Sequence, residues 1–304
     1  MKLIVLMSTY NGEKYLKEQL NSLIQQELKP TKILIRDDGS TDSTLDIIKY
    51  YADNYKYIEY YQGENLGPAK SFFELINKSE DADYYALCDQ DDVWYPDKLK
   101  VAVETLKKEI KKSIPLLYCS KVAFTDANLN VIEANTSKLY EYSDFAHSLL
   151  YQTAPGCTMV FNNEARKQII KYDMNKEFCI IHDSIIHKIC TCFGKMILDK
   201  TPHIYYRQHG GNVIGLPTNK YDQFKLRVNR FFKGDNKNYR SNTAKSLLNV
   251  FGNECLEENR HLLDVVANYQ NNKEYKKELL NLPCFKVDGI NYLFFKLLVM
   301  FNYI

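Results

Sequence analysis

An acidic stretch after the apolar residues 84–87 carries side chains that could bind a metal ion. Asp89, Asp91 and Asp92 fall within four residues, directly after a predicted buried strand. Carboxylates this close repel one another, and a fold tolerates the repulsion where a cation neutralises it. Carboxylate oxygens suit Mg²⁺ or Mn²⁺, and magnesium sites typically combine one or two carboxylates with substrate phosphates. The stretch therefore predicts a metal–diphosphate site; the alternative is a solvated acidic turn before the helix that Pro96 opens.

Two further polar clusters follow predicted strands in the first half of the chain. Ser8-Thr9-Tyr10-Asn11 ends one apolar run, and the pair Asp37-Asp38 follows the short apolar run 33–35. In a parallel sheet the carboxyl ends of the strands meet at one edge, and open α/β sheets bind ligands in the crevice outside that edge. We therefore expect both clusters to lie near the acidic stretch, although they are far from it in sequence.

These positions depend on an alternation of strands and helices in the first 110 residues. Apolar runs of strand length occur at residues 2–8, 33–35, 58–61 and 84–87. Apolar residues at helical spacing follow them at 13–24, 45–52, 69–76 and 98–110. Such alternation is typical of a parallel, doubly wound sheet with helices on both faces.

The pattern changes in the second half. We expect strands at residues 116–124, 155–161, 196–198 and 203–207, the second of them entered through a glycine. Helices are expected at 163–172 and 180–192, a polar, loop-rich segment at 126–145 and a tight turn at 208–212. From about residue 218 onward the sequence is helical in character and more basic.

The length, net charge and cysteine content of the chain exclude several classes of protein. The chain has 304 residues, enough for one large α/β domain with an appendage, and its net charge of +2 excludes nucleic-acid binding by bulk electrostatics. The eight cysteines form no C-x-x-C pair, so a zinc ribbon is not expected, and a reducing compartment such as the cytoplasm fits them best. The N-terminus is predicted to be a strand rather than a secretory signal, and no apolar run is long enough to predict a transmembrane helix.

Several short motifs occur in an order that is typical of one enzyme family. Besides the acidic stretch they are Ser8-Thr9-Tyr10-Asn11-Gly12, Asp37-Asp38-Gly39-Ser40-Thr41-Asp42, Asn65-Leu66-Gly67, Gly156-Cys157-Thr158, His182-Asp183 and Tyr206-Arg207-Gln208-His209-Gly210. On these motifs the chain resembles the family 2 glycosyltransferases of the GT-A fold over about residues 1–215. It is most similar to the bacterial rhamnosyltransferase-like members that assemble surface polysaccharides.

The resemblance implies an α/β fold of the GT-A type, Rossmann-like, with a mostly parallel central sheet and flanking helices. The catalytic domain would cover residues 1–217. Its first part, 1–115, would bind the nucleotide sugar, and its second part, 116–217, would bind the acceptor. Residues 218–304 would form a helical C-terminal extension.

The resemblance also implies where the donor and its metal ion bind. Tyr10 would lie against the nucleobase, Asp38 would accept a base N–H, and Asp89 would contact the ribose or the metal. The full set implied for nucleotide binding is Ser8, Thr9, Tyr10, Asn11, Asp38, Asn65, Gly67, Asp89 and Gln90. Asp91 would be a metal ligand, and His209 would complete the shell of a Mn²⁺ or Mg²⁺ ion. The alternatives are a turn aromatic at Tyr10, a strand-end turn at Asp38 and a plain turn residue at His209.

The second part of the domain is implied to supply the general base. Asp183 would take the proton of the attacking acceptor hydroxyl, and a single displacement would invert the anomeric carbon. Alternatively, Asp183 caps the helix that follows it, and the two roles are compatible. The family usually has an acidic residue before this aspartate, whereas this chain has His182.

The residues implied for acceptor binding are Trp94, Gly156, Cys157 and His182. Trp94 would offer an apolar platform for a sugar ring, or it anchors the core beneath the next helix. Gly156 and Cys157 would let the backbone approach the acceptor, or they form a tight strand entry. Arg207 would pair with the diphosphate, or with an acid on a neighbouring strand.

The implied activity is transfer of a sugar from a nucleotide diphosphate donor. The first expectation is L-rhamnose from dTDP-rhamnose, passed to a saccharide or lipid-linked acceptor during synthesis of capsule or another surface polysaccharide. A UDP-hexose or UDP-N-acetylhexosamine transferase is the alternative within the family, and a non-catalytic nucleotide-sugar-binding protein is the alternative from another class. A nucleotidyltransferase would require a Gly- and Arg/Lys-rich loop where this chain has Tyr10-Asn11-Gly12-Glu13, and a receiver domain would leave the second half unexplained.

The C-terminal region contains two amphipathic patterns. Basic side chains are interleaved with aromatic ones at Lys220, Lys225, Arg227, Arg230, Lys233, Lys237 and Arg240. An apolar tail too short to span a bilayer follows, with Ile290, Leu293, Phe294, Leu297, Leu298 and Phe301 at helical spacing. Both patterns are consistent with peripheral contact at the inner face of the cell membrane. The alternative is packing against the catalytic domain or against a second copy in a homodimer.

Overall fold

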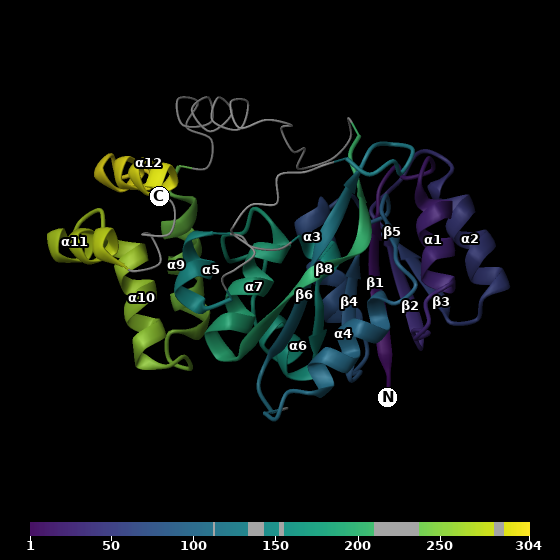
Figure 1. The fold of residues 1–304 in the computed structure, drawn as a ribbon, viewed down its shortest axis with the longest axis horizontal. Helices are drawn as coiled ribbons and strands as arrows, with labels where there is room; N and C mark the ends of the chain where they lie inside the picture. The colour runs from purple at the N-terminus through teal and green to yellow at the C-terminus, as the bar shows by residue number, and fades with distance from the viewer. Residues whose placement is uncertain (112, 133–142, 152–154, 210–236, 283–288) are drawn as a thin grey trace.

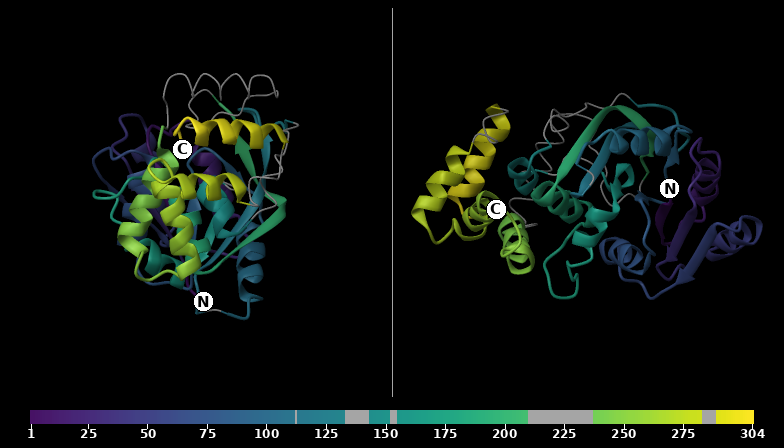
Figure 2. Two further views of the ribbon diagram at one scale, coloured as in Figure 1. Left: turned by 90° about the vertical axis from the view of Figure 1, so that its left-hand side faces the viewer. Right: turned by 90° about the horizontal axis from the view of Figure 1, so that it is seen from below.

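The computed structural model describes residues 1–111, 113–132, 143–151, 155–209, 237–282 and 289–304. A central sheet with helices on both faces forms most of the molecule, and four further helices pack together at one end of it (Figure 1). Figure 2 shows this bundle at the end of the molecule opposite the first two helices. The tight turn expected at 208–212 and the basic stretch from Lys220 to Lys233 lie mostly or wholly outside the described residues.

The sheet has eight strands in the order β3-β2-β1-β4-β7-β6-β8-β5. Their bounds are β1 Leu3–Thr9, β2 Lys32–Asp37, β3 Ile58–Gln62, β4 Tyr84–Cys88, β5 Val93–Trp94, β6 Leu116–Thr125, β7 Val160–Asn162 and β8 Lys195–Arg207. The pairings of β1 with β2, β1 with β4, β2 with β3 and β6 with β8 are parallel. The strands β7 and β5 pair antiparallel to their neighbours. The predicted mostly parallel α/β sheet is therefore confirmed.

Alternation along the strands builds two cores, one on each face of the sheet. In β1, Leu3, Val5 and Met7 face one core, whereas Ile4 and Leu6 face the other. The first core contains the apolar sides of α1 (Leu16–Ile24), α2 (Thr44–Asn54) and α4 (Lys98–Lys107). The second contains those of α3 (Pro68–Lys78), α5 (Phe145–Leu150), α6 (Asn163–Ile169) and α7 (His182–Phe193). Burial on both faces explains why the strands read as continuous apolar runs.

The C-terminal helices are α9 (Tyr239–Phe251), α10 (Glu257–Asn268), α11 (Lys273–Asn281) and α12 (Gly289–Met300). Apolar side chains of all four join the core that contains α5 and α7, so these helices pack against the helices on one face of the sheet. Packing of this kind was one of the two interpretations expected. Among the described residues, no helix is long and apolar enough to cross a membrane.

Three local predictions need correction. The two short strands expected at 196–198 and 203–207 are one strand, β8, which continues through Pro202 at an irregularity in its pairing with β6. The strand expected at 155–161 is a 3₁₀ turn, Gly156–Thr158, followed by the short β7. The two-residue strand β5 was not predicted, because two residues are too few to show a period.

Candidate active site

The polar clusters lie at one edge of the sheet, as the parallel topology predicts. Strand β1 lies between β2 and β4, with Thr9 opposite Asp37 and Met7 opposite Cys88. Neighbouring strands are about 4.8 Å apart. The residues that follow these three strand ends are therefore neighbours in space, although their sequence positions are far apart.

Asp91 and His209 meet at this edge. Their side chains are joined between Asp91 Oδ2 and His209 Nε2 at 2.8 Å. The contact arises because β5, directly after the acidic stretch, pairs antiparallel with β8, directly before His209. The imidazole also lies against the ring of Tyr15, with the ring centroids 4.8 Å apart. The two residues predicted as metal ligands are thus within reach of one small cation.

Arg207 is buried beneath this pair and fixes the acidic loop. Its Nε donates to the backbone oxygen of Asp91 at 2.8 Å, and its backbone N–H donates to Asp92 Oδ1 at 3.1 Å. The guanidinium also pairs with Glu18 on α1 and lies 4.4 Å from the ring centroid of Tyr15. For Arg207 the sequence left two interpretations, pairing with the diphosphate or with an acid on a neighbouring strand. In this structure Arg207 pairs with an acid, but that acid, Glu18, lies on a helix.

A second group of possible ligands lies beside Asp91. Ligand atoms of Asp89, Asp92 and Cys157 all fall within 4.8 Å of one another. Burial, together with the charges of Asp91 and Asp183, raises the pKa of Asp89 to about 7. Asp92 Oδ2 is buried and has no hydrogen-bond partner among the described residues. Uncompensated carboxylates of this kind are a donor set that suits a divalent cation.

The proximity of Cys157 to Asp89 and Asp92 does not follow from the sequence. Cys157 was expected near the acceptor, and its thiol lies beside Asp89 and Asp92. Burial and the charges of these two carboxylates raise the pKa of the thiol. Asp92 was predicted as one of the three carboxylates of the acidic stretch, but the individual roles were given to Asp89 and Asp91. A sequence signal for Asp92 existed in that stretch, whereas nothing in the Gly156-Cys157 turn predicts that its thiol faces the carboxylates.

Trp94 lies in the core and not at the surface. Its side chain is 2% exposed and packs among the residues beneath α4. The ammonium of Lys98 lies 3.4 Å from the centroid of the indole ring, so this buried lysine covers the ring face. The platform for a sugar ring that the resemblance implied is therefore not available here, and the core-anchor interpretation fits.

Asp183 lies in the first turn of α7, where backbone groups hold its carboxylate. Oδ2 accepts the backbone N–H of Gly156 at 3.1 Å, and Oδ1 accepts that of Ser184 at 2.8 Å. Gly156 adjoins Cys157, whose sulfur lies within 4.8 Å of ligand atoms of Asp89 and Asp92. The turn at Gly156 and Cys157 thus lies between the candidate base and the acidic stretch.

His182 precedes the candidate base and is buried, not on the surface. Its ring stacks on Phe72 with centroids 4.2 Å apart, and neither ring nitrogen has a hydrogen-bond partner among the described residues. Burial lowers the pKa of His182 to about 3, so the imidazole is neutral at physiological pH. A Cβ on Gly156 would lie 2.7 Å from His182 Nε2, which explains the glycine at this position.

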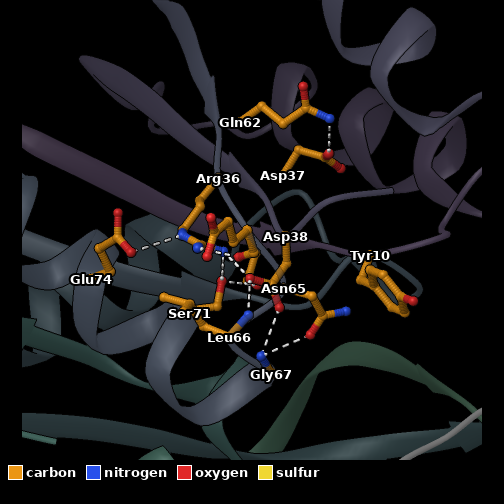
Figure 3. A network of polar contacts seen from close by, with 12 residues as sticks. Tyr10, Arg36, Asp37, Asp38, Gln62, Asn65, Leu66, Gly67, Ser71 and Glu74 are labelled. Atoms are coloured by element: carbon orange, nitrogen blue, oxygen red, sulfur yellow. Dashed lines mark hydrogen bonds and ion pairs between the residues drawn. The ribbon is translucent and has the colours of Figure 1, made fainter. Parts of the chain in front are cut away.

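Asp38 is at the centre of a buried network that holds the loop before α3 (Figure 3). Its Oδ1 accepts the N–H of Leu66 and its Oδ2 accepts that of Gly67, both at 2.9 Å. Arg36 forms an ion pair with the same carboxylate and another with Glu74, at 3.3 Å. Gly67 has a φ of +76°, a conformation that favours glycine. The carboxylate that was predicted to accept a base N–H thus already accepts bonds within the protein.

The loop after β1 is held by hydrogen bonds to two neighbouring loops. Gln90 bonds the backbone of Tyr10 twice: its Oε1 accepts the N–H at 2.9 Å, and its Nε2 donates to the carbonyl at 3.0 Å. Asn11 Oδ1 accepts the N–H of Thr41 at 2.9 Å. The ring of Tyr10 remains 46% exposed and lies outside the Asp38 network in Figure 3. Tyr10 is therefore positioned by its backbone and keeps a free ring face.

The other residues predicted for nucleotide binding differ in exposure. Thr9 is buried and its Oγ1 donates to Asp37 Oδ1 at 3.1 Å. Ser8 shares a hydrogen bond of 2.6 Å with Ser71 on α3. Asn65 is exposed, and its Oδ1 accepts the N–H of Gly67 at 3.1 Å. Ser8 and Thr9 thus join the strand end to its surroundings, whereas Tyr10, Asn11 and Asn65 lie at the surface.

Comparisons with known proteins agree with this architecture. The model of the family "Glycosyl transferase family 2" matches residues 4–120. The dTDP-rhamnosyl transferase RfbG of Shigella flexneri is 32% identical over 259 residues, which are 79% of this chain and 82% of RfbG. An uncharacterized glycosyltransferase of Rickettsia typhi is 23% identical over 232 residues, 75% of this chain and 71% of its own length.

Solved structures share the fold at low sequence identity. TarS of S. aureus, residues 1–349 in complex with UDP, superposes with a TM-score of 0.56 at 17% identity, covering 96% of this chain and 77% of that one. The mannosyltransferase PcManGT of Pyrobaculum calidifontis, in complex with GDP-Man and Mn²⁺, gives 0.54 at 12% identity, covering 99% and 84%. The fold is therefore of the GT-A type. With the family model and the relationship to RfbG, these findings show that the chain belongs to glycosyl transferase family 2.

Proposed function

We propose that this glycosyltransferase moves L-rhamnose from dTDP-rhamnose to a saccharide or lipid-linked acceptor, with inversion, in the synthesis of a cell-surface polysaccharide. The observation that carries the catalytic part of the proposal is the contact of Asp91 with His209, with the Gly156-Cys157 turn joining the neighbouring carboxylates to Asp183. The donor is inferred from RfbG, a dTDP-rhamnosyl transferase at 32% identity. A cytoplasmic location fits a reaction that uses a nucleotide sugar.

We propose Asp91 and His209 as the residues that hold Mn²⁺ or Mg²⁺, with Asp89 as a further contact. The donor set of carboxylate oxygens and a neutral imidazole suits Mn²⁺ better than Mg²⁺. When bound, the cation would stabilise the negative charge on the departing nucleoside diphosphate. Arg207 supports this role because it fixes the backbone of Asp91 from below.

We propose Asp183 as the general base. An acceptor hydroxyl is far too weak an acid to lose its proton unaided at neutral pH, so a carboxylate must accept the proton as the oxygen attacks. The backbone N–H groups of Gly156 and Ser184 support the role because they hold the carboxylate in one orientation. His182, which precedes Asp183, and Cys157, which follows Gly156, are proposed to line the sugar-binding region.

The nucleotide is proposed to bind over the loops that follow β1, β2 and β3. Tyr10 would stack on the base with its exposed ring, while Asn11, Asn65 and Gly67 would line the base and ribose. Ser8, Thr9, Asp38 and Gln90 would support these groups through the hydrogen bonds described above. Asp38 would therefore affect nucleobase binding indirectly, by holding the loop that contains Leu66 and Gly67.

A UDP-sugar donor is the second candidate within the same reaction. It is supported by a further TarS structure, in complex with UDP-GlcNAc, which covers 98% of this chain with a TM-score of 0.56. A panel of dTDP-rhamnose, UDP-glucose, UDP-galactose and UDP-N-acetylglucosamine, each with Mn²⁺ or Mg²⁺, distinguishes the donors by release of nucleoside diphosphate. We expect the fastest release from dTDP-rhamnose. Donor binding without any release would instead identify a non-catalytic nucleotide-sugar-binding protein.

We also propose that α12 contacts an anionic membrane surface from the cytoplasmic side. Exposed apolar side chains lie on this helix and just after it, at Leu293, Leu297, Met300 and Phe301. A shallow hollow beside them is lined by Lys273, Lys276, Lys277 and Lys296. Apolar side chains next to a cluster of lysines suit the headgroup region of an anionic bilayer.

Flotation with vesicles tests this contact. We expect the protein to float with vesicles that contain phosphatidylglycerol and not with pure phosphatidylcholine vesicles. The double variant Leu293→Gln/Leu297→Gln should remain unbound. If the parental protein ignores both kinds of vesicle and light scattering shows a dimer that the double variant loses, the face is a subunit contact instead.

A further inference from the structure

The helix that carries the candidate base is held by the C-terminal helices at both of its ends. Helix α7 begins with His182 and Asp183 and ends at Phe193. Tyr239, the first residue of α9, reaches its N-terminal turn, and Asn259 of α10 reaches its C-terminal turn. Figure 1 shows α5, α7 and α9 close together at the junction between the sheet and the C-terminal bundle.

The contact at the N-terminal turn passes through Ser184, which adjoins the candidate base. The backbone N–H of Ser184 donates to Asp183 Oδ1 at 2.8 Å. Its hydroxyl shares a hydrogen bond of 2.7 Å with Tyr239 Oη and accepts one of 2.6 Å from Lys188 Nζ. Ser184 and Lys188 are 0% and 2% exposed, so water cannot replace these partners. One residue thus connects the base carboxylate to the C-terminal region.

Further contacts fix α9 against the segments around α7. Arg240 Nε donates to the backbone oxygen of Leu150, at the end of α5, at 2.7 Å. Ser246 Oγ accepts the backbone N–H of Phe178, in the segment before α7, at 2.9 Å. The rings of Phe178 and Tyr239 lie with their centroids 6.1 Å apart. The start of α9 is therefore anchored on both sides of the turn that holds Asp183.

The far end of α7 is fixed by a different helix. Asn259 Nδ2 donates to the backbone oxygen of Cys192 at 2.8 Å, satisfying one of the carbonyls that a helix end leaves without an intrahelical partner. Phe193 packs edge to face on Phe251 of α9, with the ring centroids 5.2 Å apart. A helix held at both ends can neither slide nor rotate without breaking one of these contacts.

We propose that the C-terminal helical region is a positioning element of the active site, and that Tyr239, Ser184 and Lys188 hold the base-carrying turn of α7 in place. The proposal rests on the proposed function in one respect, namely that Asp183 is the base. It predicts that the region 237–282 affects the chemical step, although none of its residues is proposed to touch the substrate. Small displacements of a catalytic group reduce the rate much more than they reduce ground-state binding.

The isosteric variant Tyr239→Phe tests the proposal, because it removes the hydroxyl and keeps the ring. We expect kcat to fall about tenfold, with KM for the donor and the affinity for dTDP unchanged and the melting temperature lowered by no more than about 4 °C. Ser184→Ala should lower kcat in the same way. Tyr275→Phe is the matched control, because its ring lies in the same bundle against His261 and far along the chain from α9, and it should keep the parental kcat.

Two outcomes would overturn the proposal. Parental kcat in Tyr239→Phe would show that the hydroxyl does not position the base. A joint loss of kcat, donor affinity and melting temperature would show a general structural role. If the parental protein transfers no sugar from any donor, the proposed function fails, and hydrogen exchange still decides the present inference. Amides of residues 182–186 should then exchange faster in Tyr239→Phe, and unchanged exchange would contradict it.

Discussion

Asp91 Oδ2 and His209 Nε2 lie 2.8 Å apart, although the described part of the chain between them contains the strands β5 to β8 and the α-helices α4 to α7. The contact depends on the antiparallel pairing of β5 with β8, in which Val93 lies opposite Tyr205. A carboxylate and an imidazole in this arrangement are either hydrogen-bonded to each other or able to share a divalent cation. The proposed function requires the second state when the donor is bound.

Removing either side chain should weaken metal binding. In the presence of dTDP, we expect Asp91→Asn and His209→Ala each to reduce Mn²⁺ affinity by at least about tenfold, because each loses one ligand. Electron paramagnetic resonance of free Mn²⁺ measures the titration. His261→Ala is the control, since His261 is exposed and pairs with Glu278 away from the site. A parental titration curve for His209→Ala would remove this histidine from the metal shell.

Replacing the candidate base should separate binding from chemistry. In Asp183→Asn the amide cannot accept the acceptor proton, and we expect transfer to slow by about 10²- to 10⁴-fold. Binding of dTDP should stay within experimental error of the parental value, because Asp183 is not proposed to touch the nucleotide. Calorimetry and a transfer assay measure the two quantities, with the exposed Asp53→Asn as control. Transfer at the parental rate would exclude Asp183 as the base.

The paired hydrogen bonds between Gln90 and Tyr10 should matter for nucleotide affinity. Gln90→Ala removes both bonds and releases the backbone that carries the Tyr10 ring. Because each such bond contributes about 1 kcal/mol, we expect the Kd for dTDP to rise by about tenfold or more. Gln25→Ala changes an exposed glutamine at the end of α1 and should leave the Kd unchanged. Equal affinities for the two variants would contradict the role of Gln90.

Arg36 should contribute to stability through the network around Asp38. Arg36→Met leaves the buried Asp38 carboxylate without its guanidinium partner, and we expect the free energy of unfolding to fall by about 3 kcal/mol. Lys78→Met removes a solvent-exposed partner of Glu74 from the same network and should reduce it by less than about 1 kcal/mol. Urea denaturation measures both. If Arg36→Met and Lys78→Met lowered the free energy of unfolding equally, the burial of Arg36 would not add to its contribution to stability.

Lys188 should make stability depend on pH. Burial and the charge of Arg240 lower its pKa to about 7, against the opposing charges of Asp183 and Cys179. Between about pH 7 and pH 10 the unfolded state therefore binds more protons at this residue than the folded state, so stability rises with pH in this window. The parental free energy of unfolding should increase relative to that of Lys188→Met by up to about 1.4 kcal/mol per pH unit. Urea titrations at pH 7, 8 and 9 measure it, and the exposed Lys17→Met should follow the parental slope. Parallel curves for the parental protein and Lys188→Met would refute the lowered pKa.

The local hydrophobic pattern of the sequence was sufficient to predict most strands of the sheet. The strands β1 to β4 and the helices between them follow from apolar runs and helical spacing, because burial on both faces leaves that pattern in the sequence. The strand ends that carry Tyr10, Asp38 and Asp89 follow from the same pattern. The short β5 and the continuous β8 did not follow, because two residues show no period and Pro202 looks like a strand end.

The sequence by itself thus determined the α/β class, the order of the motifs and the residue types that can bind a cation and accept a proton. Only the tertiary structure decided their partners. It placed His209 on Asp91, directed Asp38 toward the loop at Leu66 and Gly67, buried Trp94 beneath Lys98 and connected Ser184 to Tyr239. The physical reason is that hydrophobic periodicity reports only on which face of its own element a residue occupies. Contacts between distant elements depend on how whole faces pack together, and no local window of sequence contains that information.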